Sequence, residues 1–322
     1  MAISAEQLCG GNRRALAKAI TLVESHRTDH VEQGQALLEA VLPKTGNSVR
    51  IGISGIPGVG KSTFIEAFGL HLIAQGKKVA VLAVDPSSPL AGGSILGDKT
   101  RMEELARCPE AFIRPSPTEG SLGGVAHKTR EAMLLAEAAG YDVILVETVG
   151  VGQSEFEVAG MVDFFMVLMI PNAGDELQGI KKGILELADA LVVNKADGES
   201  VNLAKMTKRH YENAFHLLRQ TSFWTPRVLT VSAIEKNNVD AVWGMVIDYV
   251  SQAKEQRAFA AKRAQQNRNW LDKLIHEMLE QVLMSHPGVQ RLWPNLERDV
   301  VEGRTTPFSA ARQVIAQMTV SQ

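Results

Sequence analysis

Nine consecutive residues, 55 to 63, have the composition and spacing of a loop that binds phosphate. They match the pattern G-x-x-x-x-G-K-[ST], with an apolar run before them and a helical pattern after them, which is the context that the motif requires. Glycines let backbone N–H groups turn toward an anion, the lysine reaches the β- and γ-phosphates, and the hydroxyl after it ligates Mg²⁺. A glycine-rich turn with a surface lysine is the alternative. The expected phosphate-binding residues are Gly55, Ile56, Pro57, Gly58, Val59, Gly60, Lys61, Ser62 and Thr63.

A second polar segment, Asn194-Lys-Ala-Asp197, ends a later apolar run and is suited to reading guanine. The Asp197 carboxylate can accept the N1–H and the exocyclic N2–H of guanine, whereas adenine sets a lone pair against the same oxygens. Asn194 can hold the loop and contact the base edge, and the aliphatic stem of Lys195 can lie over the ring. A polar turn before a helix is the alternative. A backbone N–H after the next run can meet guanine O6, from Ser232, Ala233 or Ile234.

Carboxylates follow two further apolar runs, where a metal ion beside the phosphates needs them. Glu147 ends the run 142–147, and the backbone N–H of Gly150 can sense the γ-phosphate. The role of Glu147 is open between holding the metal and positioning water, because many related sites have the shorter aspartate there. Asp85 ends another run, and Asp98 follows in a glycine-containing segment suited to a moving switch; incidental acids in a solvated loop are the alternative. The expected metal ligands are Ser62, Asp85, Asp98 and Glu147.

No motif identifies the group that activates water. Val151 follows Gly150, where Ras-type enzymes place a glutamine, so we expect slow intrinsic hydrolysis that a partner or a dimer contact stimulates. The segment 171–183 follows the fifth apolar run, on the rim where ligands bind in open α/β sheets. Its lysines can neutralise developing phosphate charge, although a plain helix start with surface lysines fits equally. The candidate catalytic residues are Lys61, Glu147 and Lys181.

These segments need a scaffold of parallel strands and crossover helices. Continuous apolar runs predict seven strands buried on both faces, at residues 50–54, 78–84, 112–115, 142–147, 164–170, 190–194 and 227–231. Residues 1–47 read as two amphipathic helices, and residues from 239 onward read as helices only. The sequence therefore predicts an α/β fold with a mostly parallel central sheet. Its three parts are an N-terminal helical segment 1–47, a nucleotide-binding domain 48–238 and a C-terminal helical region 239–322.

Composition excludes several classes of protein. The 322 residues carry 34 Lys and Arg against 36 Asp and Glu, and this net charge of −2 gives no reason to expect nucleic-acid binding. The longest apolar run has seven residues and is too short to span a membrane, so we expect a cytoplasmic protein. The charged stretch 254–268 is expected to be a solvated helix face. Trp270, Leu274, Met278 and Val282 form an apolar stripe that either the main domain or a second subunit must cover.

The combination of motifs resembles the MeaB/ArgK family of SIMIBI-class P-loop GTPases, chaperones for adenosylcobalamin-dependent methylmalonyl-CoA mutase. The segments that carry the resemblance span nearly the whole chain; they are 55–63, 84–89, 97–102, 114–116, 120–124, 147–155 and 194–197. The resemblance implies a homodimer made through the C-terminal helices and a mutase partner that binds or loses cobalamin under GTP control. It also implies that Asp85, Asp98 and Glu147 surround Mg²⁺ and that 171–183 acts as an extra switch.

We therefore expect a Mg²⁺-dependent switch that hydrolyses GTP to GDP and phosphate and controls cofactor loading or protection of a mutase. One rival is a P-loop kinase or ATPase that phosphorylates a transport-related protein. Asp197 in a guanine pocket and the lack of an acceptor domain weigh against it. Another rival is a metal-insertion GTPase, which would need a His- or Cys-rich cluster that the sequence does not have.

Overall fold

The computed structural model describes residues 4–84, 102–114, 122–148, 154–171, 182–218 and 223–319. In these ranges seven strands form one sheet, in the order β3-β2-β4-β1-β5-β6-β7, and every neighbouring pair is parallel. Each predicted strand is present and its ends agree to within one residue, which confirms the α/β fold. The strands are β1 (Val49–Gly55), β2 (Val79–Val84), β3 (Ala111–Arg114), β4 (Val143–Thr148), β5 (Phe164–Met169), β6 (Ala190–Val193) and β7 (Arg227–Thr230).

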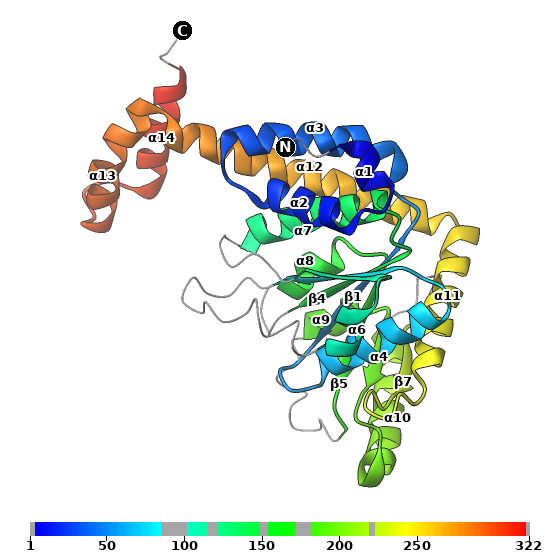
Figure 1. Ribbon diagram of the computed structural model, residues 1–322. Helices are drawn as coiled ribbons and strands as arrows, with labels where there is room; N and C mark the ends of the chain where they lie inside the picture. Colours follow the sequence, from blue (N-terminus) through cyan, green and yellow to red (C-terminus); the bar gives the residue numbers. More distant parts are fainter. Residues whose placement is uncertain are drawn as a thin grey trace. The chain divides into compact units, whose positions relative to one another are not determined.

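Helices connect and cover the strands (Figure 1). Within the described ranges, the 3₁₀ turns η1 (Leu42–Lys44) and η3 (Gly198–Ser200) accompany them. The helices are α1 (Ala5–Cys9), α2 (Arg13–Glu24), α3 (Thr28–Val41), α4 (Lys61–Ala74), α6 (Glu103–Arg107), α7 (Leu122–Ala138), α8 (Ser154–Ala159), α9 (Lys182–Leu187), α10 (Val201–Leu218), α11 (Val239–Glu255), α12 (Ala258–Ser285), α13 (Pro287–Val301) and α14 (Pro307–Thr319).

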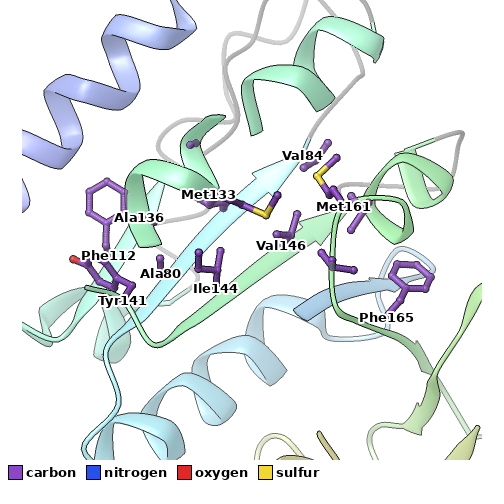
Figure 2. Packing of buried hydrophobic residues seen from close by; sticks show 14 of the residues in the cluster. Ala80, Val84, Phe112, Met133, Ala136, Tyr141, Ile144, Val146, Met161 and Phe165 are labelled. Carbon is purple, nitrogen blue, oxygen red and sulfur yellow. The ribbon is translucent and has the colours of Figure 1, made fainter. Parts of the chain in front are cut away.

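The sheet is buried on both faces because successive side chains of each strand point to opposite sides. In β4, Ile144 and Val146 join α2, α3, α7 and α8 in one core (Figure 2), whereas Val143 and Leu145 join α4, α6 and α11 in a second core. In the first core, the rings of Phe112 and Tyr141 lie 6.1 Å apart. The two cores hold the carboxyl ends of the strands in place, and the nucleotide motifs begin there.

The N-terminal segment contains three helices where two are predicted. α1 ends at Cys9, and Gly11 then adopts a left-handed conformation with φ of 76°. The side chain of Asn12 caps α2 by accepting from the backbone N–H groups of Arg14 and Ala15, each at 3.0 Å. The two-helix prediction is therefore wrong, because the glycines and the asparagine divide the first pattern.

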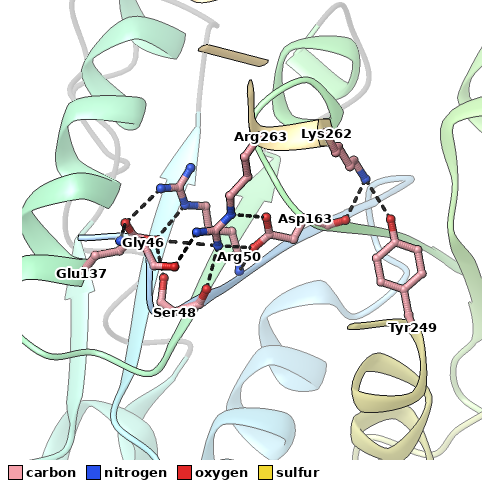
Figure 3. A network of polar contacts seen from close by, with 8 residues as sticks. All are labelled: Gly46, Ser48, Arg50, Glu137, Asp163, Tyr249, Lys262 and Arg263. Carbon is pink, nitrogen blue, oxygen red and sulfur yellow. Dashed lines mark hydrogen bonds and ion pairs between the residues drawn. The ribbon is translucent and has the colours of Figure 1, made fainter. Parts of the chain in front are cut away.

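A buried ionic network lies at the amino-terminal ends of the strands (Figure 3). Glu137 of α7 accepts from Nε and Nη2 of Arg50 at 2.8 and 2.9 Å and from the backbone N–H of Gly46 at 2.8 Å. Asp163, just before β5, accepts from Nε and Nη2 of Arg263, both at 2.7 Å. Arg263 also donates to the backbone oxygen of Gly46 at 2.7 Å. These contacts join α7, the entry to β1, the entry to β5 and the start of α12.

Lys262 extends this network toward β6. Its Nζ donates to the backbone oxygen of Asp163 at 2.6 Å, and to Asp189 Oδ2 and the Tyr249 hydroxyl, both at 3.3 Å. The prediction of a solvated helix face for 254–268 is therefore wrong at Lys262 and Arg263. The carboxylates at the strand entries are buried, and a buried carboxylate without a cationic partner costs several kcal/mol in lost hydration, as an order of magnitude. Lys262 and Arg263 supply these partners, so their side chains lie against the sheet.

The chain divides into two compact units, residues 1–263 and 264–322. The first holds the sheet, with the N-terminal helices and α11 in its cores. The second has a small core of its own, in which Val289 and Leu296 of α13 pack with Ala310 and Val314 of α14. The division at 47/48 and 238/239 stays a prediction. Among the described residues, no helix has the length and apolar character needed to cross a membrane.

Candidate nucleotide-binding site

The predicted phosphate loop lies between the end of β1 and the start of α4. Gly60 is the residue before α4 and has a left-handed conformation with φ of 90°. A Cβ atom at Gly60 would come within 2.8 Å of Asn194 Nδ2, and one at Gly55 would come within 2.6 Å of the backbone oxygen of Leu168. Glycine is thus required at both positions by close approach and by a positive φ, which is 153° at Gly55.

Lys61 is the first residue of α4, and its side chain folds back over the loop. Its Nζ donates to the backbone oxygens of Gly55 at 2.7 Å and Ile56 at 3.3 Å. Burial lowers the pKa of Lys61, and the negative charges of Glu147 and Glu155 oppose that effect. Lys61 is therefore an amine held at the loop among carboxylates, in the position from which it can reach phosphate.

Ser62 and Glu147 are brought together although 85 residues separate them. The Ser62 hydroxyl donates to Glu147 Oε1 at 3.5 Å, and only 5% of Glu147 is exposed. A hydroxyl and a carboxylate are oxygen ligands of the kind that Mg²⁺ takes, so these two residues fit the ion that the sequence predicts. Four further predicted site residues lie outside the described residues; they are Asp85, Asp98, Gly150 and Lys181.

Asn194 joins the base-reading segment to the phosphate loop. Its Nδ2 donates to the backbone oxygen of Val59 at 2.9 Å, and its Oδ1 accepts from the backbone N–H of Ala233 at 3.2 Å. Lys195 donates to the backbone oxygen of Gly58 at 2.8 Å. Both ends of the Asn194 amide are therefore engaged in holding loops. These contacts agree with the expected loop-holding role, and the expected contact with the base edge stays a prediction.

Asp197 is fixed by the segment after β7. Its Oδ2 accepts from the Ser232 hydroxyl at 2.6 Å, and the same hydroxyl accepts from the backbone N–H of Glu235 at 3.1 Å. Ser232 therefore orients the carboxylate that is expected to select guanine. Ile234 is 75% exposed in the adjacent turn, where a base can cover it.

The sequence reasoning assigned no role to Glu155. This residue lies in the first turn of α8 and is only 1% exposed. Its charge acts on Lys61 together with that of Glu147. The signal in the sequence is weak, because Glu155 lies eight residues after Glu147, and no spacing rule links a carboxylate at that distance to the phosphate loop.

Comparisons with known proteins agree with this geometry. Residues 16–288 match the model of a family described as methylmalonyl Co-A mutase-associated GTPase MeaB. The chain is 49% identical to GTPase ArgK of Escherichia coli, covering 98% of this chain and 95% of that protein. It is 47% identical to the mitochondrial methylmalonic aciduria type A homolog of Mus musculus, covering 94% and 76%.

A solved structure described as LAO/AO transport system kinase has 42% identity and a TM-score of 0.77, and it covers 98% of this chain and 96% of that one. The match therefore takes in nearly the whole of both chains. With the family model and the identities to its relatives, this places the chain in the MeaB family of GTPases.

Proposed function

We propose that this GTPase is a Mg²⁺-dependent switch that acts on an adenosylcobalamin-dependent methylmalonyl-CoA mutase, in whose loading or protection it takes part. The observation that carries the proposal is the Asn194 bridge, because it sets the expected guanine site against the phosphate loop. Lys61 and the loop amides bind the phosphates of GTP and GDP, and Ser62 and Glu147 hold the metal, with Asp85 and Asp98 from the resemblance. When bound, Mg²⁺ would neutralise part of the negative charge of the phosphates.

The mutase partnership rests on the description of the family, and turnover tests it. We expect the pure chain with Mg²⁺ to hydrolyse GTP slowly and to do so faster when methylmalonyl-CoA mutase is added. ATP is the comparison substrate because one solved relative is described as a kinase. GTP turnover indifferent to the mutase would contradict the partnership, and preference for ATP would contradict the guanine assignment. We further propose a cytoplasmic location.

A homodimer through the C-terminal unit is part of this proposal. α12 carries a stripe of apolar side chains that are between 46% and 62% exposed: Leu271, Ile275, Met278, Leu279 and Val282. It shares Met278 and Val282 with the predicted stripe, whose Trp270 and Leu274 are half-buried. The same unit has an apolar groove of about 360 Å³ between the end of α12 and the helices α13 and α14, lined by Trp293, Val301 and Ile315 among others. Exposed apolar surface of this kind marks an interaction site.

The stripe makes the dimer testable. We expect Met278→Glu to convert a species with the mass of two chains into one with the mass of a single chain, because it buries a charge in an apolar contact. Asn269→Glu is the matched control, since it adds the same charge on the other side of α12. Light scattering after gel filtration measures the mass. A wild-type monomer, or a Met278→Glu dimer, would contradict the assignment.

Asp197→Asn tests the base-reading carboxylate. We expect GTP affinity to fall by at least about 100-fold, because an amide cannot accept both guanine N–H groups. Xanthine nucleotides should bind better to this variant, since their C2 carbonyl accepts from the new NH₂ group. Competition with a fluorescent nucleotide measures the affinities of GTP, ATP and XTP. An unchanged preference for guanine over adenine and xanthine would refute the role of Asp197.

A further inference from the structure

The backbone ladder between the two strands that carry the phosphate loop and Glu147 ends close to both of them. Backbone pairing between β1 and β4 runs as far as Ile53 and Glu147. Beyond this pair, β1 continues along β5 as far as Gly55, and β4 continues along β2 as far as Thr148. The ends of β1 and β4 are thus paired to different neighbours, and their own backbone ladder ends at the pair Ile53 and Glu147.

A side-chain hydrogen bond joins the two strands one position beyond the end of this ladder. The Thr148 hydroxyl donates to Ser54 Oγ at 3.0 Å, and the two residues are 0% and 2% exposed. Apolar side chains such as Val146 and Val167 form the core on the sheet faces around them. Burying a hydroxyl without a hydrogen-bond partner costs free energy. Valine has nearly the same shape as Thr148 and would fill its place without burying a polar group. The two hydroxyls therefore satisfy each other's hydrogen-bonding capacity between β1 and β4.

One member of the pair is adjacent in sequence to an expected metal ligand, and the other to the loop that leads to one. Thr148 follows Glu147, and Ser54 precedes Gly55, the first residue of the loop that leads to Ser62. The Ser62 hydroxyl and Glu147 Oε1 lie 3.5 Å apart, one supplied by the chain after β1 and the other by β4. Mg²⁺ accepts only near-ideal positions of its oxygen ligands, so a small parting of the two strands would weaken the site.

We propose that Thr148 and Ser54 are a positioning pair that holds β1 and β4 together where their backbone pairing ends, and so keeps Glu147 and Ser62 within reach of one Mg²⁺. In this proposal the pair acts through the strands and is not itself a ligand of the metal. The inference rests on the Mg²⁺ site of the proposed function, and its test separates the two.

The test is the rate at which a fluorescent mant-GDP leaves the protein as Mg²⁺ is titrated. We expect Thr148→Val and Ser54→Ala each to raise the Mg²⁺ concentration for half-maximal effect roughly five-fold, as for loss of one buried hydrogen bond. The double variant should be no worse than either single one, since both remove the same bond. Thr148→Ser keeps the hydroxyl and should restore the wild-type response. Release in EDTA should stay unchanged in all of them.

Thr129→Val is the matched control, because it makes the same change at a buried threonine of α7. Any of three results would overturn the proposal. The single variants could respond to Mg²⁺ as the wild type does, the effect of the double variant could equal the product of the single effects, or Thr129→Val could show the same shift. If Thr148→Val does not fold, Ser54→Ala and Thr148→Ser carry the test. A wild type that is insensitive to Mg²⁺ would instead overturn the metal site itself.

Discussion

Replacement of Lys61 by alanine is expected to lower kcat for GTP hydrolysis roughly 10³-fold, as for loss of a preorganised group that stabilises transition-state charge. Lys61 is held over the loop by the backbone oxygens of Gly55 and Ile56, with Glu147 and Glu155 as negative neighbours. Alanine leaves the phosphate charge to the backbone amides and the metal. Phosphate release under single-turnover conditions at saturating GTP measures the effect.

Two variants make this result specific. Lys44→Ala removes an exposed lysine before β1 and should leave kcat unchanged. Lys61→Arg keeps the charge but replaces a compact ammonium by a planar fork, so we expect it to remain strongly impaired. Lys61→Ala with kcat within about ten-fold of the wild type would show that this lysine does not carry the main phosphate charge in the transition state.

Replacement of Glu137 by glutamine is expected to lower the free energy of unfolding of the first unit by about 3 kcal/mol. None of the Glu137 side chain is exposed. The change leaves the Arg50 guanidinium without its carboxylate and places an NH₂ group where two donors already point. This corresponds to a fall in melting temperature of roughly 6–12 °C, which scanning calorimetry at neutral pH measures.

Acid provides an independent check on Glu137. Burial alone would raise the pKa of Glu137, but hydrogen bonds from Arg50, Ser48 and Gly46 lower it below its ordinary value of 4.5. A lowered pKa gives stability that is present above the unfolded value and is lost as pH falls through the folded value. The difference between wild type and Glu137→Gln should therefore shrink below pH 4.5. Glu39→Gln, at an exposed site on α3, is the control and should melt like the wild type at every pH.

The strands were predictable because their signal is local. Residues 143–146, for example, are apolar throughout, and a strand buried on both faces of a parallel sheet favours this at successive positions. The phosphate loop was predictable for the same reason, since its glycines, lysine and hydroxyl lie within nine residues. The local pattern gave a wrong prediction at residues 1–47, where two helices were expected and three are present. The apolar periodicity there continues across the glycines that separate α1 from α2.

The ionic network could not be predicted, because its members come from distant parts of the chain. Arg50 and Glu137 are 87 residues apart, and Asp163 and Arg263 are 100 residues apart. Nothing around Arg263 distinguishes it from the exposed charges of its helix until the sheet brings Asp163 to it. Glu155 and the Thr148–Ser54 pair were missed for a related reason, since sheet register and helix packing create their surroundings.

The positions of Arg50 and Gly55 in one seven-residue strand have a consequence for protein engineering. The amino-terminal end of β1 enters the ionic network, and its carboxyl-terminal end becomes the phosphate loop. Libraries aimed at heat tolerance can therefore be confined to the network end of the sheet, and libraries aimed at nucleotide preference to the opposite rim. Because well-separated substitutions combine almost additively, gains found in the two searches should survive when they are joined in one gene.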